Sequence, residues 1–194
     1  QVDVEISFGT PDNVFRVIEG LMAEVFKKML GVDIETPFPR FAHAEAMRRW
    51  GIDKPDLRFG MEIVDLTEAV RGCGFKVFTD TIAAGGVVKG IVLKGGANYS
   101  RKQIDDLTTM AKQLGAGGLA YVLLADEGVK SPILKFLGEE GTAKVCTAAG
   151  SEKGDALFIV SDRAMKTEAI LGQLRLHLGR THNLIDRKIG RAHV

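Results

Sequence analysis

The chain has 194 residues and a mass of 21.0 kDa, enough for one good core or for one compact domain with an appendage. Its hydrophobic fraction of 45% and charged fraction of 26% are typical of a soluble globular protein. The 26 Lys and Arg residues against 25 Asp and Glu residues give a net charge of +1, so any attraction to nucleic acid must come from a local patch.

Cysteine usage and apolar runs narrow the class of protein further. Cys73 and Cys146 are the two cysteines of the sequence, which excludes a disulfide framework, and no Cys and His spacing suits zinc. We therefore expect reduced thiols and no metal site. No apolar run approaches the ~20 residues that a membrane-spanning helix needs, and no signal peptide opens the chain. The expectation is a soluble, cytoplasmic protein without a membrane partner.

The first predicted elements are a strand and a long helix. Residues 2–8 alternate strictly between apolar and polar, which is the period of a strand with one buried face. Thr10-Pro11 has the form of a helix start, with Thr as the N-cap and Pro at the first helical position. Apolar residues then recur every three or four positions up to Met29, so 11–30 is predicted to be an amphipathic helix. The chain starts without Met, and we expect further sequence before it.

The next stretch, up to Gly72, is predicted to be mostly irregular because three prolines interrupt it. We expect one short helix near 42–50 and another at 66–71, with Asp65 as its cap. Beyond Gly72 the sequence becomes richer in β-branched residues and glycine.

The second half is predicted to alternate strands with helices. Strands are expected at 75–78, 87–93, 119–124 and 156–160, and helices at 101–114, 133–137, 143–149 and 166–178. This order predicts an α+β fold, a two-layer sandwich with a mixed, mainly antiparallel sheet.

Two helix starts in this half are candidate phosphate-binding sites. Ser100 precedes Arg101 and Lys102, and Lys130 precedes a similar start at Ser131-Pro132. The free N–H groups of a helix start attract anions. A tight connection with solvated cations is the preferred interpretation of both patterns, since no dinucleotide or P-loop glycine spacing is present. No histidine has a recognisable nucleophile partner either. The residues alone therefore indicate no complete active site.

Several stretches resemble one enzyme family. Residues 1–8 are similar to the second strand of motif 2 in class II aspartyl-tRNA synthetases, and 19–22 to the helix after it. Ala44-Glu45-Ala46-Met47-Arg48 and Trp50-Gly51-Ile52-Asp53-Lys54-Pro55-Asp56-Leu57-Arg58-Phe59 match the bacterial pattern. Six further stretches resemble the inserted domain called GAD: residues 75–78, 95–97, 100–105, 117–120, 130–133 and 171–175. The match runs in one order from the first residue to about residue 187.

The resemblance implies four regions. Residues 1–34 would be a remnant of the class II catalytic core, 35–72 a connecting segment with short helices, and 73–180 the GAD insert. Residues 181–194 would return to the core, although 189–194 fit neither the family nor a helix and are expected to be a foreign tail. Motifs 1 and 3 and the arginine-bearing strand of motif 2 are not matched, so this chain is expected to be unable to make aspartyl-adenylate.

The resemblance also implies partners and site residues. The parent enzyme would use ATP and Mg²⁺, act as a homodimer through a region absent here, and charge tRNA specific for aspartate, or also for asparagine. Gln1 and Asp3 would line the amino-acid pocket, where a carboxylate suits the substrate ammonium. Candidate contacts to tRNA are Lys54, Arg58, Arg101 and Lys102. We expect the fragment itself to bind no cofactor.

Two other functions stay open beside an accessory part of a tRNA ligase. The first is a GAD module of a tRNA-dependent amidotransferase, a family that shares this domain. Residues 1–60 argue against it, since such a module has no reason to carry a motif 2 strand. The second is a structural spacer that contacts no RNA.

Overall fold

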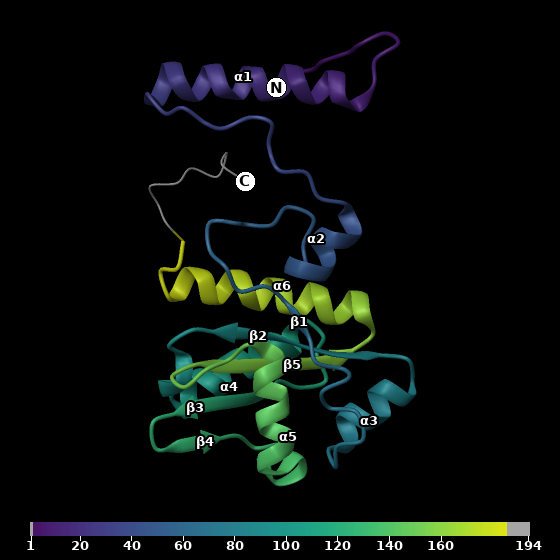
Figure 1. Cartoon of the computed structure of the whole chain (residues 1–194), viewed down its shortest axis with the longest axis vertical. Helices are drawn as coiled ribbons and strands as arrows, with labels where there is room; N and C mark the ends of the chain where they lie inside the picture. Colours follow the sequence, from purple (N-terminus) through teal and green to yellow (C-terminus); the bar gives the residue numbers. More distant parts are fainter. Residues whose placement is uncertain (1, 186–194) are drawn as a thin grey trace.

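The computed structural model describes residues 2–185, and Figure 1 shows their arrangement. The elements in chain order are α1 (Pro11–Leu30), α2 (His43–Trp50), β1 (Val64–Asp65), α3 (Lys76–Ala83), β2 (Val87–Leu93), the 3₁₀ turn η1 (Gly96–Asn98), α4 (Arg101–Gln113), β3 (Ala120–Ala125), β4 (Gly128–Lys130), α5 (Leu134–Ala149), β5 (Ala156–Asp162) and α6 (Ala164–Thr181).

One sheet organises the second half of the described residues. Its five strands lie in the order β1-β2-β5-β3-β4. All neighbouring pairs are antiparallel, with β2 and β5 in register from Val87 opposite Asp162 to Leu93 opposite Ala156. The predicted α+β class and the mainly antiparallel sheet are confirmed. No parallel pair occurs in the sheet of residues 64–162, so the sheet is antiparallel throughout rather than mixed.

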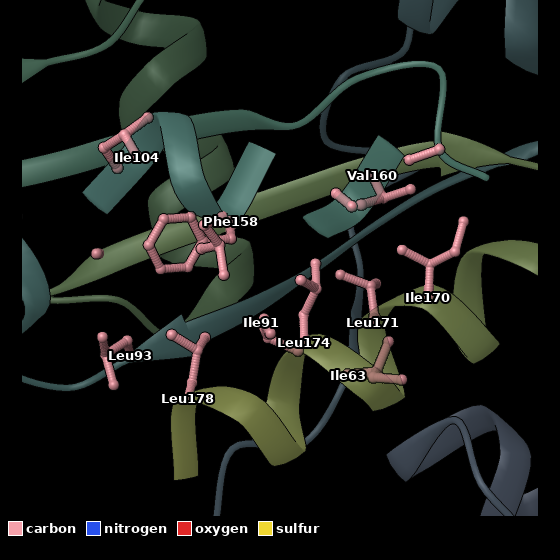
Figure 2. Close-up of a cluster of buried hydrophobic side chains, with 14 of the residues drawn as sticks. Ile63, Ile91, Leu93, Ile104, Phe158, Val160, Ile170, Leu171, Leu174 and Leu178 are labelled. Carbon is pink, nitrogen blue, oxygen red and sulfur yellow. The ribbon is translucent and has the colours of Figure 1, made fainter. Parts of the chain in front are cut away.

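Helices cover both faces of this sheet. Figure 2 shows the core on one face, where side chains of β2 and β5 such as Ile91 and Phe158 pack against Leu174 and Leu178 of α6; α4 belongs to the same core. The core on the other face joins α3 and α5 to the alternate residues of the same strands, including Leu157 and Ile159. The domain therefore has three layers where two were predicted.

The central strand explains the third layer. Residues 156–160 of β5 read Ala-Leu-Phe-Ile-Val and are all buried, at 1% exposure or less. A strand buried on both faces shows a continuous apolar run, because neither face can carry polar residues. This run was present in the sequence, and it indicates covering helices on both sides.

Three predicted elements have a different structure. Residues 2–8 are irregular or turn rather than strand, and Phe8 takes a left-handed φ of 55°. Residues 75–78 belong to the start of α3, since Phe78 and Ile82, one helical turn apart, both reach the core. Residues 66–71 form hydrogen-bonded turns, although Asp65 caps them as expected by accepting from the N–H of Thr67 at 2.9 Å.

Helix α1 packs differently from the other long helices. None of its residues is buried, and Figure 1 shows it apart from the sheet, beyond α2 and α6. The segment after it supplies its contacts: the N–H of Phe38 donates to Glu19, and Arg40 lies 4.7 Å above the Phe15 ring and pairs with Asp12. Large apolar side chains, including Met29 and Leu30, remain exposed.

Helix α2 packs on α6 through two glycines. A Cβ atom on Gly51, whose φ is +69°, would lie 2.0 Å from the carbonyl oxygen of Glu168. A Cβ atom on Gly172 would lie 2.7 Å from the carbonyl oxygens of Trp50 and Gly51. The two backbones therefore touch directly, and only glycine permits this at either position.

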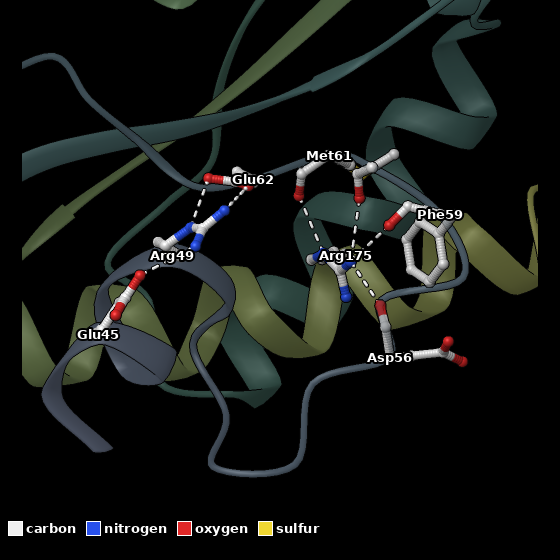
Figure 3. Close-up of polar contacts among 8 residues, drawn as sticks. Glu45, Arg49, Asp56, Phe59, Met61, Glu62 and Arg175 are labelled. Carbon is white, nitrogen blue, oxygen red and sulfur yellow. Dashed lines mark hydrogen bonds and ion pairs between the residues drawn. The ribbon is translucent and has the colours of Figure 1, made fainter. Parts of the chain in front are cut away.

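A buried guanidinium fixes the next segment to the same helix, and we call this arrangement the Arg175 clamp. Arg175 of α6 is fully buried; its Nε donates to Met61 at 2.9 Å, and its Nη2 lies 2.7–3.0 Å from the carbonyls of Asp56, Phe59 and Gly60. Figure 3 shows these carbonyls converging on the side chain. The guanidinium also lies 4.1 Å from the centre of the Phe59 ring. Burial lowers the pKa of Arg175 to about 10, so it is charged at neutral pH.

Replacing Gly172 with Ala should lower the free energy of unfolding of the domain built on the sheet by about 1–3 kcal/mol, because the added methyl group forces the two backbones apart. Thermal unfolding followed by near-UV circular dichroism measures this. The matched control is Gly20→Ala on α1, where an added Cβ meets nothing within 4 Å; no loss is expected there. Equal stability of the two variants would refute the close contact.

Replacing Arg175 with Met should cost about 3–5 kcal/mol, because four carbonyls lose their donor in a buried setting. Urea denaturation gives the value. Arg180→Met on the exposed side of α6 removes the same charge and should change stability by less than about 0.5 kcal/mol. If the Arg175→Met variant proved as stable as the Arg180→Met variant, the role of the clamp would be contradicted.

Candidate nucleic-acid interface

A network of charges orders the start of the candidate site. Arg49 of α2 donates from Nε to Glu62 at 2.9 Å, from Nη2 to the other oxygen of Glu62 at 2.5 Å, and from Nη1 to Glu45 at 2.9 Å. Its guanidinium lies 4.3 Å from the centre of the Trp50 ring. These hydrogen bonds hold the pKa of Glu62 below its usual value. Figure 3 shows the network beside the Arg175 clamp.

A groove opens where this ordered segment meets α6. Its volume is about 710 Å³, and we call it the α2–α6 groove. It is lined by Pro39, Phe41, His43, Ala46, Ile52, Asp53, Lys54, Pro55, Asp56, Leu57, Leu176 and Arg180. Apolar side chains dominate this list. The exposed cations Lys54 and Arg180 lie with Asp53 at its surface.

The predicted tRNA contacts lie in two places. Lys54 is exposed in the α2–α6 groove. Arg101 and Lys102 are exposed in the first turn of α4, where Ser100 caps the helix by accepting from the N–H of Gln103 at 3.3 Å. Neither of these two residues lines the groove.

Arg58 is already engaged with its own loop. Its side chain is 10% exposed and bonds to both carboxylate oxygens of Asp56, from Nε at 2.8 Å and from Nη2 at 2.6 Å. These bonds hold the pKa of Asp56 below its usual value. The charge of Arg58 is therefore paired, and its geometry suits the shaping of the loop better than contact with a phosphate.

Of the two proposed aspartate-pocket residues, the structure describes Asp3, which is not among the residues that line the groove. Gln1 lies outside the described residues. Asp3 is exposed in the irregular segment before α1, and its role stays a prediction.

Sequence reasoning missed His43 and Arg180 as groove residues. They are 137 positions apart, and only the packing of α2 on α6 brings them to one surface. The sequence contains only one indication of either residue, its place relative to a predicted helix. His43 lies at the start of the predicted short helix. Arg180 lies one helical turn beyond Leu176, just past the end of the predicted last helix.

Residues 2–185 contain no cluster of three or more His, Cys, Asp or Glu side chains that could hold a metal ion. None of the helices in this range combines the length and apolarity needed to cross a lipid bilayer.

Comparison with known proteins identifies the region around the sheet. Residues 78–171 match the GAD domain, and they lie inside the predicted insert. Over 97% of its length the chain is 49% identical to the aspartate–tRNA ligase of Clostridium perfringens, of which it covers 32%. It is 50% identical to the aspartate–tRNA(Asp/Asn) ligase of Heliobacterium modesticaldum and 45% identical to that of Aquifex aeolicus, with 96% of the chain covered in each case.

The chain spans about a third of the length of these relatives. The similarity is not confined to the GAD domain, because it also covers most of the residues before it. The chain is therefore similar, over nearly its whole length, to a stretch of bacterial aspartate–tRNA ligases, and residues 78–171 within it match the GAD domain.

Proposed function

We propose that this chain is part of an ATP-dependent ligase that attaches aspartate to tRNA during translation in the cytoplasm. The observation that carries the proposal is the extent of the similarity, which covers 97% of the chain and so includes α1, α2 and the connecting segment. An amidotransferase that shares only the GAD domain does not account for those residues.

The chemistry is assigned to the parent enzyme rather than to this chain. We take the parent as a class II synthetase that binds ATP and Mg²⁺ and acts as a homodimer. Gln1 and Asp3 are proposed to line the aspartate pocket of the complete core. The names of the relatives include both aspartate-only and Asp/Asn ligases, and the parent's tRNA is proposed to be specific for aspartate, or for asparagine as well.

The role proposed for this chain is a weak electrostatic contact with tRNA. The proposed contacts are four exposed cations: Lys54 and Arg180 in the α2–α6 groove, and Arg101 and Lys102 in the first turn of α4. With a net charge of only +1, the chain should neutralise about 2–4 phosphates and show a shallow salt dependence. In the intact ligase the core holds the tRNA, so a weak second contact counts as a tethered one.

The purified chain should show no aspartate-dependent exchange of pyrophosphate into ATP, because the arginines that the family uses to bind adenylate are not matched in it. The measurement is incorporation of labelled pyrophosphate, with a complete aspartate–tRNA ligase as the positive control. Exchange above a boiled sample would refute the division between this chain and the catalytic residues.

Binding of aspartate-specific tRNA should weaken in Arg101→Ala/Lys102→Ala and in Lys54→Ala/Arg180→Ala. The slope of log K against log salt should fall by about 1–2 in each variant. Fluorescence titration at low and moderate salt measures both effects. Lys27→Ala/Lys28→Ala on α1 is the control, since it removes the same charge elsewhere. If all three variants bind alike, the insert is a spacer that does not contact RNA at these sites.

A further inference from the structure

A second cavity lies on the opposite face of the sheet from α6. Its volume is about 330 Å³, and we call it the α3–α5 pocket. Its lining comes from the starts of α3, β3 and α5 and from β5, and it includes Phe75, Phe78, Gly117, Gly118, Lys135 and Phe136. The volume lies at the lower end of the range for small-ligand sites.

Three phenylalanines form a series that leads from the core to the surface through this pocket. Phe78 is buried at 1% exposure, Phe75 packs edge-on against it at 4.8 Å, and Phe136 lies 5.2 Å beyond Phe75 with 41% of its surface exposed. The Nζ of Lys135 lies 4.9 Å from the centre of the Phe136 ring. The outermost aromatic ring is thus open to solvent and accompanied by a cation.

Two glycines of the pocket have no structural need to be glycine. Neither Gly117 nor Gly118 has a left-handed φ, and a Cβ added to either would meet nothing within 4 Å. This contrasts with Gly172, where a Cβ would collide with the backbone of α2. Bare backbone without a crowding neighbour is useful where another molecule approaches closely. The fold leaves that room at the pocket.

We propose that the α3–α5 pocket binds an unpaired base of an RNA strand, with the base against Phe136 and its phosphate near Lys135. This inference rests on the proposed function, in which the partner is tRNA. Every base has a flat π-face, so an exposed aromatic ring beside a cation suits single-stranded RNA of varied sequence. Lys76, next to Phe75 in the chain, is a further exposed cation at the start of α3. The small volume favours one planar ring over a helix of a protein partner.

The test uses a fluorescein-labelled hexamer of riboadenylate and a blunt 12-base-pair RNA duplex, titrated with the whole chain at low salt. Phe136→Ala should weaken hexamer binding by about 10-fold or more, within the range for one lost stack. Gly118→Leu should weaken it similarly by occupying the pocket, while its melting temperature stays that of the wild type. Neither substitution should change binding of the duplex.

The variants of the candidate interface separate this inference from the proposed function. If tRNA binding depends on Arg101 and Lys102 while hexamer binding ignores both Phe136→Ala and Gly118→Leu, the pocket proposal is overturned and the proposed function stands. If the hexamer depends on the pocket but aspartate-specific tRNA does not bind at all, the pocket is confirmed as an RNA site and the tRNA contact proposed for this chain fails. No hexamer binding by the wild type overturns the pocket proposal.

Discussion

Burial of β5 on both of its faces is the constraint on which the rest of the domain depends. A strand with five consecutive buried apolar residues needs cover on both of its faces. It therefore takes a central position in the sheet, with helices on both sides. Its neighbours β2 and β3 pair with it in antiparallel register. The alternate side chains of the same strand then anchor the two cores, one with α4 and α6 and the other with α3 and α5. The α3–α5 pocket opens at the edge of the second core, where Phe78 and Ile159 belong to both.

The polar interactions act at a different place, the junction between α6 and the segment before the sheet. Arg175 satisfies carbonyls that would otherwise be buried without donors, Arg49 joins α2 to Glu62, and Arg58 closes its own loop through Asp56. Hydrogen bonds to buried or half-buried arginines hold this segment in place, in addition to the burial of Phe59. This junction sets the shape of the α2–α6 groove.

The sequence alone predicted elements whose signals are local. Helix α1 followed from Thr10-Pro11 and its apolar period, α4 followed from Ser100, and the break inside α5 occurs at Gly138, between the two helices that were predicted. The strand predicted at residues 75–78 was wrong because so short a run, with three apolar residues among four, fits a strand and the first turn of a helix equally well. The strand predicted at residues 2–8 was wrong because a strand needs a partner strand, which a local pattern does not supply. The groove pairs residues far apart in the chain, so only the tertiary fold could reveal His43 and Arg180 as neighbours.

The Arg175 clamp has a mechanical consequence for how the domain is attached. The segment that enters the sheet passes residues 56–61, and α6 is the helix by which the chain leaves it. The Arg175 side chain therefore links residues 56–61, where the chain enters the domain, to α6, where the chain leaves it. The glycine contact between α2 and α6 lies beside this link. Because these two connecting segments are linked, they cannot move independently of each other. The domain is therefore attached through one stiff connection instead of two flexible ones.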